Sequence, residues 1–271
     1  MTPPLLRPAS AGASTGGLTS PHHSKDNSVT IERVETWILR VPFIRTSADF
    51  NDAHHELIGV TVHAGGLSGM GYSFITDNAG GTAVKALLDD LLVPRILGRS
   101  PLDVERIWHE LDLLTHRMGT GINRFAMAAI DIALWDLKAK MHGNSLAREI
   151  GQLTDSVPVY GSGKAGNRLG IDELVQLAAV RDALGPDIRI MIDANERLDR
   201  PTALWLGQRL AEQDIYWFEE PVLSTDLETH AFLAAQLPMS ITGGEHHCSA
   251  AEFQPYIARG AFGIVQPNVC M

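Results

Sequence analysis

Hydrophobic residues in the second half of the chain fall into short runs of strand length, separated by longer amphipathic segments. Three of these runs end on a carboxylate: residues 188–192 before Asp193, residues 215–218 before Glu219, and residues 240–244 before Glu245. Each carboxylate follows the previous one by 26 residues, which is room for one strand, one helix and two short connections. We expect the intervening helices at about residues 201–212 and 225–236. The pattern predicts a parallel sheet with right-handed crossover connections.

The same alternation extends to both sides of this stretch. Residues 157–161 are predicted to form a further strand, and residues 171–184 an amphipathic helix that leads into the next strand. Toward the end of the chain, a helix is expected at about residues 250–259 and a last strand at residues 262–266. The second half of the chain therefore predicts a series of strand–helix units.

In the first half of the chain, strands come before helices. Alternating hydrophobic residues and a glycine-rich turn predict an antiparallel meander with strands at residues 29–41, 56–62 and 72–75. Helices are expected at about residues 82–92, 101–117 and 123–142. Pro94 would stop the first helix, and Ser100 would cap the second, with Pro101 at its first position. Small residues along the third helix predict close packing against another element, so this half is expected to form an α+β unit.

The composition divides the chain into three parts. Residues 1–27 are rich in Pro, Ser, Thr, Gly and Ala and lack hydrophobic periodicity, so we expect a disordered leader. This leader is either a transit peptide or a non-native extension, and it lacks the continuous apolar region of a secretory signal. Residues 28–151 are expected to form the N-terminal α+β domain, and residues 152–271 the domain of strand–helix units.

Charge and cysteine content exclude several classes of function. The 271-residue chain has a formal net charge of −10 and a pI near 5.5, with no block of lysine or arginine. This argues against nucleic acid and anionic membranes as partners. Cys248 and Cys270 are the only cysteines and lack a paired metal-type spacing, so no disulfide framework is expected. No apolar run approaches membrane-spanning length, and we expect a cytoplasmic protein.

The three carboxylates predict a metal site. The carboxyl ends of neighbouring parallel strands lie side by side, so Asp193, Glu219 and Glu245 would converge and repel one another unless a cation held them. Oxygen ligands of this kind suit Mg²⁺. The alternative is structural, because an acid after a strand is also common as a helix N-cap or a solvated loop residue. Three acids at equal intervals favour the metal site.

Lys164 lies one strand–helix unit before Asp193 and is therefore expected at the same edge of the sheet. Beside a cation and partly out of water its pKa would fall, which makes it a candidate general base. The alternative is a surface lysine whose aliphatic stem covers apolar residues. A phosphoryl-transfer enzyme is disfavoured, because no glycine-rich phosphate loop follows a strand.

Four short motifs stand at the ends of the predicted strands: Ile192-Asp193-Ala194-Asn195, Trp217-Phe218-Glu219-Glu220-Pro221, Gly244-Glu245-His246 and Val265-Gln266-Pro267-Asn268. Together they resemble the enolase superfamily, most closely the mandelate racemase and muconate lactonizing enzyme group with its acid-sugar dehydratases. Residues 128–137 resemble the last long helix of that family's N-terminal domain. The resemblance implies an α+β capping domain followed by a (β/α)8, or TIM-like, barrel.

The resemblance also implies a reaction. Asp193, Glu219 and Glu245 would bind Mg²⁺, which would stabilise an enediolate formed when a base removes the proton α to a substrate carboxylate. Lys164, matching the second lysine of the family's K-x-K motif, would be that base. The expected outcome is dehydration of an acid sugar, or racemisation or epimerisation of an α-hydroxy acid.

Other residues receive supporting roles from the resemblance. Asn195 and His246 are expected to contact the substrate, with a plain packing role as the alternative for His246. Glu220 would support the metal site or pair with a barrel lysine or arginine. The expected partners are a small-molecule carboxylate and further copies of the chain in a homo-oligomer.

The sequence departs from the family pattern at three places. The K-x-K motif reads Ser162-Gly163-Lys164, so its first lysine is absent. Lys164 follows Val157 by only seven positions, whereas a parallel crossover needs a dozen or more residues. Asn268 stands where a catalytic aspartate or lysine is expected, and an amide is not a base at neutral pH.

These departures predict an incomplete barrel. Counting strand ends gives about five of the eight strands, so we expect an internal deletion and a C-terminal truncation. Two functions stay open. One is a Mg²⁺-dependent lyase or racemase acting on an acid sugar, and the other is a non-catalytic paralogue or fragment that at most binds metal or associates with a full-length subunit.

Overall fold

The computed structural model describes residues 29–42, 54–75, 80–161 and 177–271. The predicted leader at residues 1–27 and the candidate base Lys164 lie outside the described residues. None of the described helices is long and apolar enough to cross a membrane.

The predicted antiparallel meander is confirmed. Its three strands are β1 (Arg33–Pro42), β2 (His54–Ala64) and β3 (Leu67–Ile75). They pair in the order β1-β2-β3, with Arg33 opposite His63 and Glu56 opposite Ile75. The inward-facing residues of β2 are buried at alternate positions, as expected for a sheet with one face on a hydrophobic core.

Two boundaries of the helices that follow differ from the prediction: the end of the first helix and the start of the second. Pro94 does not end the first helix: α1 (Gly81–Leu87) runs through a π turn at Leu88–Leu92 into α2 (Val93–Ile96). The wider π turn accommodates the proline, which has no N–H to donate. The next helix, α3 (Val104–Thr115), begins after the predicted start, because the Ser100 hydroxyl instead accepts a hydrogen bond from Leu102 N at 3.3 Å in a preceding turn.

The longest helix, α4 (Ile122–Met141), lies directly on β3 and is followed by the short α5 (Leu146–Glu149). Two glycines of β3 make this close approach possible. A Cβ on Gly69 would stand 2.1 Å from the Ala133 carbonyl oxygen, and one on Gly71 would stand 2.3 Å from the Ala129 carbonyl oxygen. The close packing predicted from the small residues of this helix is therefore made against the meander.

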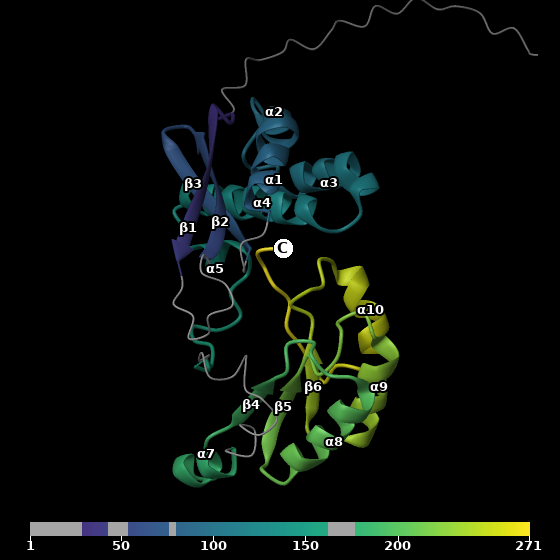
Figure 1. The fold of residues 1–271 in the computed structure, drawn as a ribbon. Coiled ribbons are helices and arrows are strands. Elements are labelled where there is room, and N and C mark those ends of the chain that lie inside the picture. Colours follow the sequence, from purple (N-terminus) through teal and green to yellow (C-terminus); the bar gives the residue numbers. More distant parts are fainter. Residues whose placement is uncertain (1–28, 43–53, 76–79, 162–176) are drawn as a thin grey trace, which may run out of the picture.

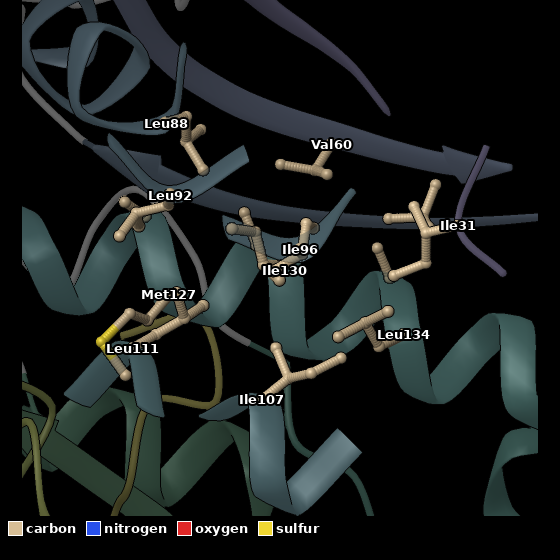
Figure 2. Close-up of a cluster of buried hydrophobic side chains, with 14 of the residues drawn as sticks. Ile31, Val60, Leu88, Leu92, Ile96, Ile107, Leu111, Met127, Ile130 and Leu134 are labelled. Atoms are coloured by element: carbon tan, nitrogen blue, oxygen red, sulfur yellow. The ribbon is translucent and has the colours of Figure 1, made fainter. Parts of the chain in front are cut away.

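The core of this unit lies between the meander and the helices. Figure 2 shows side chains from β2, the π turn Leu88–Leu92, α2, α3, α4 and the segment before β1 meeting in one cluster. Its labelled members are Ile31, Val60, Leu88, Leu92, Ile96, Ile107, Leu111, Met127, Ile130 and Leu134. All ten are buried, so the burial of apolar surface holds strands and helices together.

The second half of the described chain alternates strand and helix (Figure 1). Its strands are β4 (Ile190–Asp193), β5 (Ile215–Glu219), β6 (Ser240–Gly243) and β7 (Ile264–Val265). Its helices are α7 (Leu177–Leu184), α8 (Arg200–Ala211), α9 (Leu227–Gln236) and α10 (Ala250–Ala258). The strands form one parallel sheet in the order β4-β5-β6-β7, which confirms the predicted parallel pairing.

Helix caps explain why α8 and α9 begin where they do. The Asp199 carboxylate accepts a hydrogen bond from Thr202 N at 2.9 Å, and the Asp226 carboxylate accepts one from Thr229 N at 3.0 Å. Each satisfies a free N–H of the first helical turn. The helices then pack against β5 and β6 around a second buried cluster that includes Phe218, Leu233 and Ile241.

The strand predicted at Val157–Gly161 is wrong. This segment pairs with no strand among the described residues, and its valines are exposed, Val157 at 70% and Val159 at 88%. Alternation gives only a local preference for strand, whereas a ladder needs a partner. Instead, the Tyr160 ring packs against the Trp217 ring of β5 in a T-shaped arrangement, with ring centroids 5.1 Å apart. The described residues therefore contain four parallel strands, one fewer than predicted.

Candidate functional site

The predicted carboxylates stand at one edge of the parallel sheet. Asp193 is the last residue of β4 and Glu219 the last of β5, and the two are opposite each other in the ladder. Ala194 N donates to the Glu219 carbonyl at 3.0 Å, which ties the two strand ends together. Glu245 follows the end of β6 by two residues. Each strand thus delivers one acid to the edge where its chain turns toward the next helix.

Burial and mutual repulsion disturb the ionisation of all three acids. Burial raises the pKa of Asp193 and of Glu219, although hydrogen bonds partly offset the effect in each. Burial, together with the charges of Glu220, Asp193 and Glu219, raises the pKa of Glu245 to about 7, and His246 partly offsets the rise. Negative charge is therefore concentrated in a place that water only partly solvates.

Two hydrogen bonds orient these carboxylates. Trp217 Nε1 donates to Glu219 Oε2 at 3.1 Å, and Asn195 N donates to Asp193 Oδ1 at 2.8 Å. Asn195 adopts a left-handed backbone with φ of 47°, which turns the chain so that its own N–H meets the aspartate. In both contacts the donor lies two residues from the acid in the sequence.

His246 lies among acids from three loops. Its Nε2 atom is 3.5 Å from Glu220 Oε2, 3.6 Å from Glu245 Oε1 and 3.9 Å from Glu196 Oε2. The Glu220 carboxylate beside it raises the pKa of His246 to about 9, against the opposing effect of burial, and the charges of Glu196 and Glu245 add to the rise. The surrounding carboxylates thus favour the protonated form of the imidazole ring.

No role is predicted for Glu196 from the sequence, and of the two predicted roles of Glu220 the pairing with a barrel lysine or arginine is not found among the described residues. Glu220 faces His246 rather than a barrel lysine or arginine among the described residues. Both glutamates have a left-handed backbone, with φ of 60° at Glu196 and 35° at Glu220. Strained backbone of this kind gathers at functional sites. The available sequence signal was their position, within three residues of the acids that end β4 and β5.

The most closely gathered ligand atoms are not those of the predicted trio. Among the described residues, the one group of histidine, cysteine or carboxylate atoms that meet within 4.8 Å of one another belongs to Glu196, Glu220 and His246. The carboxylate oxygens of the predicted trio, Asp193, Glu219 and Glu245, do not form such a group. Their charges still interact, because those of Asp193 and Glu219 raise the pKa of Glu245.

Asn268 and Lys164 are the two remaining predicted site residues. Asn268 is half-buried, and its side-chain oxygen accepts a hydrogen bond from Cys270 N at 3.0 Å. Its amide therefore stabilises a local turn. Lys164 lies outside the described residues, so the proton-transfer role predicted for it stays a prediction.

The trio fits a hard divalent cation in its chemistry. Its members offer only carboxylate oxygens, the ligands that Mg²⁺ prefers. Each carboxylate is half-buried and has a raised pKa. A cation bound between the three carboxylates would therefore reduce the repulsion between their negative charges. The donor set and the charge both suit Mg²⁺.

Comparison with known families matches most of the chain. Residues 28–151 match the family described as mandelate racemase / muconate lactonizing enzyme, N-terminal domain. Residues 161–271 match the family described as enolase C-terminal domain-like.

Two curated relatives share a third of their aligned residues with this chain. L-talarate/galactarate dehydratase from Salmonella typhimurium is 33% identical over 75% of this chain. D-galactarolactone cycloisomerase from Agrobacterium fabrum is 33% identical over 65% of this chain. The chain spans 58% and 54% of the lengths of these two relatives.

Solved structures resemble most of the chain. A racemase from Streptomyces coelicolor with bound magnesium superimposes with a TM-score of 0.81 at 29% identity, covering 89% of this chain and 76% of that one. L-talarate dehydratase from Polaromonas sp., complexed with Mg and L-glucarate, gives 0.76 at 28% identity, covering 89% of this chain and 73% of that one.

Proposed function

Because the chain belongs to the mandelate racemase and muconate lactonizing enzyme group of the enolase superfamily, we propose that it removes the proton α to the carboxylate of an acid sugar with the help of Mg²⁺. The outcome is dehydration of the sugar acid, or its racemisation or epimerisation. The observation that carries the proposal is the meeting of Asp193, Glu219 and Glu245 at one sheet edge, with each pKa raised.

In this proposal Asp193, Glu219 and Glu245 hold the ion. A bound Mg²⁺ supplies positive charge where negative charge develops on the substrate as its α-proton leaves. Trp217 and the backbone of Asn195 keep two of the carboxylates in place through their hydrogen bonds. The protein thus orients its ligands before the substrate arrives.

The other proposed roles concern the substrate. Lys164 is the base that takes the α-proton, and Asn195 and His246 contact the sugar acid. The cationic ring of His246 suits an anionic or hydroxyl-rich ligand. Asn268 has no ionisable proton and takes no part in proton transfer.

An acid sugar is favoured over other carboxylates by the relatives. The Salmonella relative is a talarate/galactarate dehydratase, and the Polaromonas structure holds L-glucarate together with Mg. Since this chain spans just over half of the curated relatives, substrate and activity are proposed for it on their example.

A non-catalytic role is the second candidate. It is favoured by the four-stranded sheet, by the absence of ladder pairing at Val157–Gly161 among the described residues, and by the use of Asn268 in a local turn. In this case the chain binds metal or a full-length subunit without turning over substrate.

Proton exchange in D₂O separates the two candidates. The purified chain is incubated with Mg²⁺ and a panel of acid sugars, and the α-proton is followed by NMR. Exchange that requires Mg²⁺ and is lost in Lys164→Met is expected for the enzyme. A folded sample that exchanges no α-proton with any substrate contradicts the catalytic proposal, and a melt whose midpoint Mg²⁺ raises then identifies the metal-binding alternative.

A further inference from the structure

Glu220 is a buried carboxylate that has one ion-pair partner and no hydrogen bond among the described residues. Its side chain is 1% exposed, and neither carboxylate oxygen has a hydrogen bond among the described residues. A buried charge without hydrogen bonds is costly unless a cation lies next to it. The group that faces it is the imidazole of His246, at 3.5 Å.

The spacing around His246 is unlike that of a strong ion pair. Charge-assisted N–H to carboxylate bonds are about 2.7–2.9 Å long, whereas Nε2 stands 3.5 Å from Glu220 Oε2 and 3.9 Å from Glu196 Oε2. Ligand atoms around a tetrahedral ion with bonds of about 2.1 Å lie roughly 3.4 Å apart. The distances from His246 Nε2 to the two carboxylates are therefore closer to the spacing between two ligands of one ion than to the length of a charge-assisted hydrogen bond.

The two glutamates are held in position by different parts of the fold. Ser224 N donates to Glu196 Oε1 at 2.5 Å, which leaves the Oε2 atom of that carboxylate to face His246. The backbone N–H of Glu220 donates to the Thr242 carbonyl at 3.0 Å, which ties Glu220 to β6. The loops after β4, β5 and β6 thus contribute one ligand atom each.

We propose that Glu196, Glu220 and His246 form a second cation site, separate from the one assigned to Asp193, Glu219 and Glu245. Two carboxylates with one imidazole suit a divalent transition metal such as Co²⁺, Mn²⁺ or Zn²⁺ rather than Mg²⁺, because neutral imidazole nitrogen is a ligand for those ions. The ion takes the place of the proton on His246 Nε2, which is released as the metal binds. Glu245, whose Oε1 atom is 3.6 Å from the same nitrogen, lies between the two sites. The inference goes beyond the proposed function and does not require catalysis.

The test is a titration of the full chain with Co²⁺ in the presence of saturating Mg²⁺. Binding is followed by the visible absorption of the bound Co²⁺ ion and by the paramagnetic shift of the His246 ring protons. Glu220→Gln and Glu196→Gln are compared with Asp193→Asn and with Glu228→Gln, a substitution in an exposed pair with Arg259. Circular dichroism checks that each variant is folded.

The proposal expects one Co²⁺ per chain under these conditions. Glu220→Gln and Glu196→Gln each weaken Co²⁺ binding by about tenfold or more, while Asp193→Asn and Glu228→Gln leave it within about twofold. Two outcomes overturn the proposal: no Co²⁺ uptake by the folded wild-type chain, or uptake that Asp193→Asn abolishes and both glutamine variants retain. The two glutamine variants act at different loops, so a folding failure of one leaves the other to decide.

Discussion

The indole Nε1 of Trp217 donates a hydrogen bond of 3.1 Å to Oε2 of Glu219, two residues further along β5. The pair exists because residues two apart on a strand face the same side of the sheet. The ring of Tyr160 packs on the same indole, with centroids 5.1 Å apart. Trp217 therefore orients a carboxylate that we assign to the metal, and is itself held in place.

Substituting Trp217 by phenylalanine tests this positioning role. Phe keeps an aromatic ring for Tyr160 but removes the N–H, so Glu219 loses its donor. We expect Mg²⁺ affinity to fall by about tenfold, in the range seen when a residue supporting a ligand is removed. Isothermal titration measures the affinity, and Trp205→Phe, at an exposed position on α8, serves as the matched control. Equal Mg²⁺ affinity in both variants and the wild type would contradict the role.

Because α4 packs closely on β3, adding one methyl group at Gly71 is predicted to lower the stability of the fold. In Gly71→Ala the new Cβ meets the Ala129 carbonyl at 2.3 Å, so strand or helix backbone must move. We expect the free energy of unfolding to fall by about 2 kcal/mol or more. Urea denaturation measures it, with Gly161→Ala as control, since a Cβ at Gly161 has no neighbour within 4 Å. A midpoint unchanged by Gly71→Ala would show that the packing is looser than described.

Asp131 on α4 predicts a dependence of stability on pH. Burial, and then the charge of Glu105, raise its pKa from the ordinary 3.8 to about 6. The folded chain therefore holds this proton more tightly than the unfolded chain, so stability is lost as pH rises from about 4 to about 6.

Asp131→Asn is expected to remove that loss. At pH 7 the variant should be more stable than the wild type by on the order of 2 kcal/mol, while at pH 4 the difference should shrink toward zero. Thermal or urea melts across this range measure the effect, with the exposed Asp90→Asn as control. Parallel stability curves for the wild type and Asp131→Asn would contradict the account.

Periodicity in the sequence was sufficient to predict most of the elements. Alternation at β1 to β3 predicted the meander, and acids at equal intervals predicted the parallel pairing that sets Asp193 opposite Glu219. Both follow from side-chain patterns that repeat within one element.

Features set by contacts between elements could not be predicted in this way. Residues 157–161 have strand-like alternation, but they pair with no described strand, and Tyr160 packs on Trp217 instead. Pro94 reads as a helix stop, yet the preceding π turn accommodates it. The grouping of Glu196 and Glu220 around His246 depends on left-handed turns after two strands, which leave no periodic trace in the sequence.

The central claim, that Asp193, Glu219 and Glu245 hold Mg²⁺, is tested most directly by a Mg²⁺ titration of four purified chains. The wild type is compared with Asp193→Asn, Glu220→Gln and Asp199→Asn, the last of which alters only the N-cap of α8. We predict one Mg²⁺ per chain, with affinity weakened by about tenfold or more in Asp193→Asn and kept within about twofold in the other two. Undiminished Mg²⁺ binding by Asp193→Asn, or its loss in Glu220→Gln alone, would contradict the assignment.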